Sequence, residues 1–146
     1  MKKIIISALI LMQVSASYAG TLPEVTEKIL ESFKQTFKEA KEAAWAENVA
    51  GFDVNFKYDE IDTRIWYDND GNILRTQRYY GEQKLPPFLL GKLKKKYSDK
   101  SIFGITEVSD NEGVVYYIKM EDEKNWVTIK ASAAGFTEVY EKYRKA

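Results

Sequence analysis

The chain has 146 residues, with 22 basic and 22 acidic side chains and no cysteine or histidine. The missing residue types exclude disulfides, Cys–His and Ser–His–Asp nucleophiles, and zinc or copper sites built on thiolate or imidazole. The balanced charge gives no overall field that would favour nucleic acid, so we expect no nucleic-acid partner. We also expect no cofactor. The 14% aromatic content can supply the core of one domain without cross-links.

Residues 1–19 have the pattern of an export signal. Two lysines precede an apolar run from Ile4 to Val14, and the small residues Ser17 and Ala19 stand before Gly20, at positions −3 and −1 of a signal peptidase site. The run is shorter than the roughly 18 apolar residues that span a bilayer. We therefore expect cleavage, a periplasmic or secreted mature chain, and no membrane insertion after cleavage.

The first half of the mature chain predicts one helix followed by strands. Capping-box spacing at Thr21 and an apolar stripe at intervals of three or four predict a helix from Thr21 to about Ala44, with a break near Phe37. Trp45 follows this helix and is expected in the core. Alternating apolar and polar residues predict strands at 51–58, 61–67 and 72–80. Before the last of these strands, Gly71 is placed to take positive φ in a turn.

The second half repeats this pattern. Leu85 opens a helix through about Tyr97, and strands are predicted at 102–109, 114–120, 126–131 and 136–143. The halves align at an offset of about 63 residues, which pairs Gly71 with Gly135.

We therefore predict an α+β fold for residues 20–146. It is a single domain made of two tandem repeats, about 20–83 and 84–146, each with one helix plus an antiparallel meander. The two repeats share a sheet, both helices pack on one sheet face, and the other face is open to water.

Several motifs resemble those of a known family. They are the Leu22-Pro23 start, the Asp68-Asn69-Asp70-Gly71 turn and the Leu85-Pro86 helix start, together with Val25, Phe33, Phe37, Ala40, Trp45 and Tyr97. Their order resembles the PepSY-like family of exported, β-lactamase-inhibitor-like proteins, over nearly all of the mature chain. The resemblance implies tandem α/β repeats whose open sheet face binds protein. The chain departs from the family pattern at Lys38, where a proline is common, and at the second turn, which has lost its acidic residues.

Two kinds of polar motif in the sequence could hold a metal ion or act in catalysis. With Gly71 at position 6 of a calcium loop, Trp66 and Gln77 occupy positions 1 and 12, where acidic ligands are needed. We therefore interpret residues 68–71 as a hairpin turn and predict no metal site. Carboxylates such as Asp59 and Glu60 are interpreted as solvated loop acids, so we predict no catalytic residue. An enzyme that uses carboxylates alone remains a minor alternative.

Aromatic and basic residues on the predicted open face are the strongest functional signal. Successive side chains of a strand point to opposite faces, so residues between buried neighbours point away from the helices. This places Arg64, Trp66, Tyr117, Lys119 and Trp126 on the open face. Trp, Tyr and Arg are the residue types that anchor protein interfaces.

The leading hypothesis is a non-enzymatic, inhibitor-like module that binds an unknown protein or peptide in the cell envelope. The alternative is a structural or assembly protein that buries the same face in a homodimer.

We predict that the exported product begins at Gly20, because the small residues at 17 and 19 fit a signal peptidase. Intact-mass measurement of the periplasmic fraction tests this. A product that retains Met1 and sediments with membranes would contradict the prediction.

Overall fold

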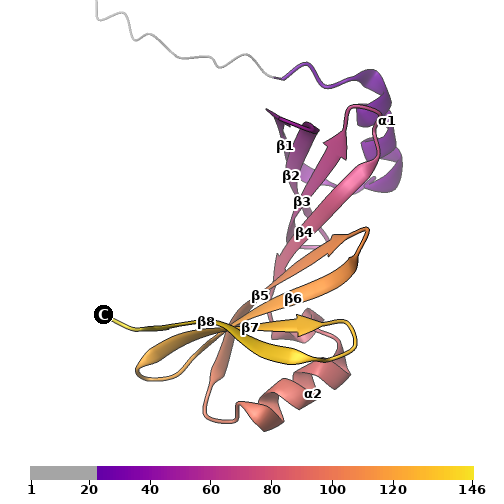
Figure 1. Ribbon diagram of the computed structural model, residues 1–146. Coiled ribbons are helices and arrows are strands. Elements are labelled where there is room, and N and C mark those ends of the chain that lie inside the picture. Colours follow the sequence, from indigo (N-terminus) through magenta and orange to yellow (C-terminus); the bar gives the residue numbers. More distant parts are fainter. Residues whose placement is uncertain (1–22) are drawn as a thin grey trace, which may run out of the picture.

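The computed structural model describes residues 23–146 as two helices packed on one antiparallel sheet of eight strands (Figure 1). The signal segment and the predicted capping residue Thr21 lie outside the described residues. Each strand pairs with its neighbour in sequence, in the order β1 to β8. The first unit contains α1 (Glu27–Thr36), β1 (Lys41–Asn48), β2 (Gly51–Tyr58), β3 (Ile61–Asp68) and β4 (Ile73–Tyr80). After a short helix at Glu82–Lys84, the second contains α2 (Pro87–Lys96), β5 (Ser101–Asp110), β6 (Gly113–Glu121), β7 (Asn125–Ser132) and β8 (Thr137–Arg144).

This element order confirms the predicted α+β fold, in which each helix is followed by an antiparallel meander. The two turn glycines that align between the halves, Gly71 and Gly135, adopt φ of 85° and 83°. Positive φ is accessible to glycine because it lacks a Cβ. The positive φ predicted for Gly71 is therefore confirmed, and Gly135 in the aligned turn adopts the same conformation.

The predicted first helix is wrong at both ends. α1 begins after Thr26, which is its N-cap residue, and ends at Phe37, the position of the predicted break. The chain beyond it turns back as β1, which pairs with β2 from Asn48 opposite Gly51 onward. Alanines in this stretch satisfied a helical spacing, but pairing with β2 provides ladder hydrogen bonds that outweigh this weak local preference.

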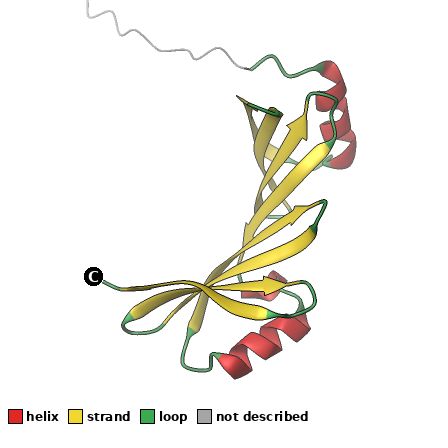
Figure 2. Cartoon of the chain, viewed as in Figure 1, coloured by secondary structure: helices red, strands yellow, loops and turns green. Residues whose placement is uncertain are grey.

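Both helices lie on the same side of the sheet (Figure 2). The apolar core forms two clusters on this side, one under each helix. Under α1, Ile29 and Phe33 pack against residues of β2 and β3, and Trp45 of β1 is half-buried beside them. Under α2, Leu89 and Leu93 pack against β5, β6 and β7. Each side chain of this kind that is fully buried contributes about 1.5–3 kcal/mol. The two clusters account for the placement of both helices on one face.

A polar contact fills the space between the two clusters, where β4 pairs with β5. The Arg78 guanidinium lies 3.2 Å from a carboxylate oxygen of Glu107, and the buried Tyr80 hydroxyl donates to the other carboxylate oxygen. Burial, followed by the bond to Glu107, raises the pKa of Tyr80. Tyr80 and Ile61 belong to the first unit by sequence but pack in the cluster under α2. The two units therefore share side chains as well as a sheet.

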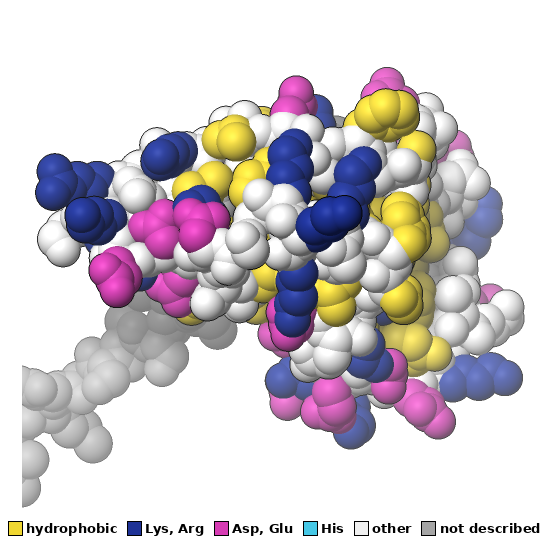
Figure 3. Space-filling view, turned by 90° about the horizontal axis from the view of Figure 1, so that it is seen from below, with side chains coloured by type: hydrophobic (Ala, Val, Ile, Leu, Met, Phe, Trp, Pro, Cys, Tyr) yellow, Lys and Arg dark blue, Asp and Glu magenta, His cyan; other side chains and the backbone are white. Residues whose placement is uncertain are grey.

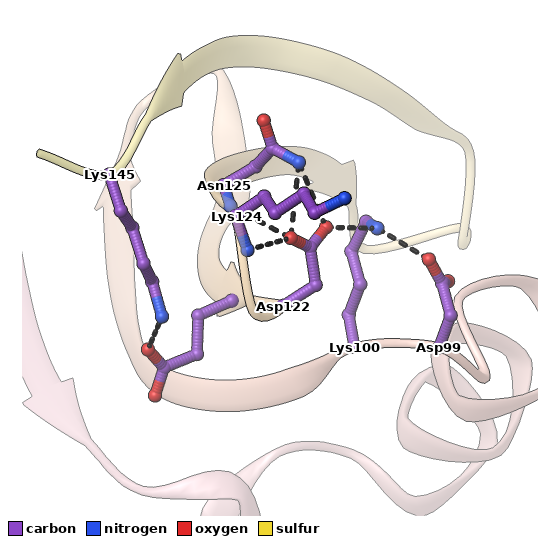
Figure 4. A network of polar contacts seen from close by, with 7 residues as sticks. Asp99, Lys100, Asp122, Lys124, Asn125 and Lys145 are labelled. Carbon is purple, nitrogen blue, oxygen red and sulfur yellow. Dashed lines mark hydrogen bonds and ion pairs between the residues drawn. The ribbon is translucent and has the colours of Figure 1, made fainter.

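A second polar cluster ties the exit of α2 to the β6–β7 turn (Figure 4). The Lys100 ammonium lies 2.8 Å from Asp122 and 2.7 Å from Asp99. The Asp122 carboxylate also accepts hydrogen bonds from the backbone N–H groups of Lys124 and Asn125. The Lys100 hydrogen bond, followed by that from Lys124, lowers the pKa of Asp122.

This geometry predicts an acid-sensitive contribution to stability. A carboxylate whose folded pKa lies below its unfolded value of about 3.9 stabilises the fold above that pH, and the contribution is lost as pH falls through the folded pKa. Asp122→Asn keeps an oxygen for the turn but removes the ion pair with Lys100. We expect the variant to be less stable than wild type at pH 7, with a smaller difference at pH 3, in urea unfolding followed by circular dichroism. Asp62→Asn, at an exposed pair with Lys57, is the control. An equal difference at both pH values would contradict the prediction.

Candidate binding face

The five residues predicted to face away from the helices all do so. Trp66 lies between Ile65 and Tyr67, which are 0% and 1% exposed on the helix side. Trp126 likewise precedes Val127, which is buried. The register across the sheet aligns these alternations, so their outward side chains share one surface, which we call the open face. The role of these residues in binding stays a prediction.

One group of these residues is centred on Trp66, in β3. The guanidinium of Arg64 lies 4.6 Å from the Trp66 ring centroid, and that of Arg75, in β4, lies 5.2 Å from it. Arg64 also donates to Asp53, at 2.9 Å. Asp53 is 2% exposed, so Arg64 compensates a buried carboxylate. Arg64 therefore has a structural role that the sequence pattern did not reveal.

A second group is centred on Trp126, in β7. The Lys119 and Lys145 ammonium groups lie 4.9 and 4.8 Å from its ring centroid. Phe103 meets the same ring edge-on, at 5.1 Å between centroids. Lys145 is paired with Glu121 at 2.6 Å. Trp126 is thus held by two cations and an aromatic ring on a surface that stays accessible.

The predicted residues therefore form two sets rather than one continuous site. Tyr117 and Lys119 lie on β6, next to Trp126 on β7, whereas Arg64 and Trp66 lie on β3. β3 and β6 are three strands apart, which is roughly 14 Å at the usual strand spacing.

Other exposed aromatic residues extend the second set. Tyr140 lies 5.2 Å from Tyr117 between ring centroids, and Lys119 lies 5.6 Å from the Tyr143 ring. Tyr79 of β4 also belongs to this surface, since its hydroxyl lies over Gly104. The exposed fractions of Tyr79, Phe103, Tyr140 and Tyr143 are 46%, 56%, 62% and 41%. We call these four residues, with Tyr117 and Trp126, the aromatic patch.

Sequence reasoning missed most of these additional residues for identifiable reasons. Phe103 lies where the β5–β6 register shifts between Ile102 and Gly104, and Tyr140 lies at the shift in the β7–β8 register. A register shift breaks the alternation on which the sequence argument rests. Arg75 and Tyr79, by contrast, follow simple alternation along β4 and could have been found from it.

The remaining polar features of the described residues are acidic side chains, a turn and a hollow on the open face. No group of three or more acidic side chains in residues 23–146 is arranged to hold a metal ion. The Asp68 carboxylate accepts from the backbone N–H groups of Asp70 and Asn72, which stabilise the turn. Hydrogen bonds from Asn72 lower the pKa of Asp68. A hollow of about 390 Å³ on the open face is lined by polar side chains, including Arg64 and Gln77.

The end of the molecule covered by α2 is a competing surface. Figure 3 views the molecule from this end and shows Lys and Arg side chains interspersed with hydrophobic ones. Three lysines of α2 are hydrogen-bonded or ion-paired within the chain. Lys92 donates to the Gly135 carbonyl, Lys94 pairs with Glu82 at 2.9 Å, and Lys96 donates to Thr137. We therefore rank this end below the open face as a binding surface.

Solved structures with the same fold come from Bacteroides species. A BLIP-like protein from Bacteroides fragilis superposes with a TM-score of 0.65 at 18% identity, over 86% of this chain and 89% of that one. A Bacteroides eggerthii protein, provisionally named as periplasmic, gives a TM-score of 0.64 at 18% identity, over 84% and 90%. A DUF2874 family protein from Bacteroides uniformis gives 0.63 at 15% identity, over 82% and 89%.

These similarities confirm the β-lactamase-inhibitor-like fold expected from the sequence. No family model matches the chain, and no curated protein matches its sequence. Membership of the PepSY-like family therefore stays a prediction. Among residues 23–146, none of the helices is long and apolar enough to cross a membrane.

The two kinds of tryptophan environment predict different costs of truncation. Trp126 lies on the open face, so Trp126→Ala loses mainly cation–ring contacts and should cost about 1 kcal/mol. Trp45 packs against Phe33 and Tyr67 in the core, so Trp45→Ala should cost about 3 kcal/mol. Urea unfolding followed by far-ultraviolet circular dichroism measures both. Equal losses would show that Trp126 is part of the core.

Proposed function

We propose that the protein is an exported, non-enzymatic module that binds a protein or peptide of the cell envelope through its open face. The observation that carries the proposal is the aromatic patch, in which Tyr79, Phe103, Tyr140 and Tyr143 are exposed and Tyr117 and Trp126 are partly exposed. Exposed apolar patches larger than a few hundred Å² are uncommon on monomers unless they bind something. The patch also combines Trp and Tyr with basic side chains, the composition of interface anchors.

Three observations support export and an inhibitor-like role. The N-terminal residues have the pattern of a cleavable signal. The Bacteroides eggerthii neighbour is provisionally named as periplasmic, and the Bacteroides fragilis neighbour is named BLIP-like. The absence of Cys and His from the chain favours binding over nucleophilic catalysis.

A homodimer that buries the same face is the second candidate. It is favoured by the position of β8 at the edge of the sheet, where Val139 and Tyr140 are 56% and 62% exposed. An edge strand has unpaired backbone groups that can pair with another chain. In this arrangement the aromatic patch would be continuous with an edge-to-edge contact.

The proposal predicts that truncating both outward tryptophans removes the partner without unfolding the protein. Cross-linked pulldown from periplasmic extract would compare wild type with a variant carrying Trp66→Ala and Trp126→Ala. Each hot-spot truncation should cost about 2 kcal/mol or more of binding. Phe88→Ala is the matched control, because Phe88 is 57% exposed on α2, on the helix-covered side.

Light scattering and tryptophan quenching separate the two candidates. A monomer with quenchable tryptophans favours binding of a different protein, and a dimer with protected tryptophans favours the homodimer. Capture of the same partner by the double variant would contradict a role for the open face.

A further inference from the structure

We propose that the partner contacts the open face with an extended acidic segment, whose carboxylates bind Lys119 and Arg75 and whose apolar side chains pack on the aromatic patch. The inference rests on the proposed function and specifies the chemistry of the partner. It follows from how the charges around the two outward tryptophans are compensated.

Around Trp126, one cation is paired and the other is not. Lys145 lies 2.6 Å from the Glu121 carboxylate, so its charge is compensated within the chain. In the described part of the chain, no carboxylate lies within ion-pair distance of Lys119, whose ammonium is next to the Trp126 and Tyr143 rings. The neighbouring Lys130 is compensated by Glu138, at 3.8 Å. Lys119 is therefore the cation of this group that makes no direct ion pair, although Tyr143 and the more distant Glu141 interact with its charge.

The same arrangement occurs around Trp66. Arg64 is paired with the buried Asp53 at 2.9 Å. Arg75, on the other side of the ring, is exposed and has no carboxylate within ion-pair distance among residues 23–146. Each outward tryptophan thus lies beside one cation that forms an ion pair and one that does not, although Asp110 is the cross-strand neighbour of Arg75. Stacking on a ring contributes only about 0.5–1 kcal/mol at an exposed site, so it does not replace an ion pair with a partner.

The distance between the two cations without a direct ion pair favours a chain segment over a small acid. Arg75 on β4 pairs with Asp110 of β5, and Lys119 on β6 pairs with Gly104 of the same strand. These β5 positions are about six residues apart, or roughly 20 Å along the strand. The cations also lie two strands apart, which adds roughly 10 Å across the sheet. About seven residues of extended chain span this diagonal.

The overall charge of the face favours carboxylates over a polyphosphate backbone. Acidic side chains such as Asp62, Asp110 and Glu141 are interspersed with the basic ones on the same face. A nucleic acid or other polyanion is bound through a broad positive field, which this mixture does not provide. Two isolated cations beside aromatic rings instead match single carboxylates flanked by apolar side chains.

Peptide display on the immobilised protein tests this chemistry. The probe is a random library of peptides of about twelve residues, long enough to span both cations. We expect the enriched peptides to carry Asp or Glu together with apolar residues. Synthetic copies should bind a variant with Arg75→Met and Lys119→Met about tenfold or more weakly, as expected for loss of charge-assisted contacts. Copies with Asn and Gln in place of the acids should lose a similar factor.

The matched control carries Lys28→Met and Lys95→Met, which remove one exposed lysine from each helix. Its affinity for the acidic peptides should equal that of wild type. Neutral or basic peptides that depend on Trp66 and Trp126 would overturn this inference but leave the proposed function standing. Failure to enrich any peptide that depends on these tryptophans would overturn both. A stable dimer that buries Trp126 would identify a second copy as the occupant and overturn the acidic partner.

Discussion

The pairing of every strand with its neighbours in sequence is the constraint on which the rest of the structure depends. It makes one alternation of inward and outward side chains run across the eight strands, apart from local register shifts such as those in the β5–β6 and β7–β8 pairs. A shift of one residue in any strand would exchange its buried and exposed sets. Burial of Ile65, Ile118 and Ile129 against the helix side opposes such a shift. The same packing therefore determines that Trp66 and Trp126 point outward.

Having both helices on one side makes the two sheet faces chemically different. The helix side is largely apolar under each helix, and Arg78 and Glu107 form an ion pair between the two helices. The open face has no covering layer from the described residues and is in contact with water. Cations that lie against the rings of Trp66 and Trp126 partly cover apolar surface while remaining hydrated, as long basic side chains commonly do.

The sequence predicted most of the fold because the strands have regular alternation and the turns contain glycine where positive φ is needed. It failed at β1, where Ala40 and Ala44 fitted a helical stripe while pairing with β2 decided the structure. The outward direction of the five predicted residues followed from local alternation alone. The contacts of Lys145 with Trp126 could not be predicted, because they join the end of the chain to a strand about twenty residues earlier.

Solubility alone does not account for the way the charges are arranged on the open face. If the cations served only to keep the tryptophans hydrated, cations that are ion-paired with nearby carboxylates would serve equally well. Arg64 and Lys145 are such cations. Arg75 and Lys119 differ because each lies beside an aromatic ring and makes no direct ion pair among residues 23–146. A side chain held against a ring has already lost part of its rotamer freedom, so a carboxylate that binds it meets a smaller entropic cost. Cations that are held beside partly exposed rings without a direct ion pair are what the proposed binding of an acidic, partly apolar segment requires.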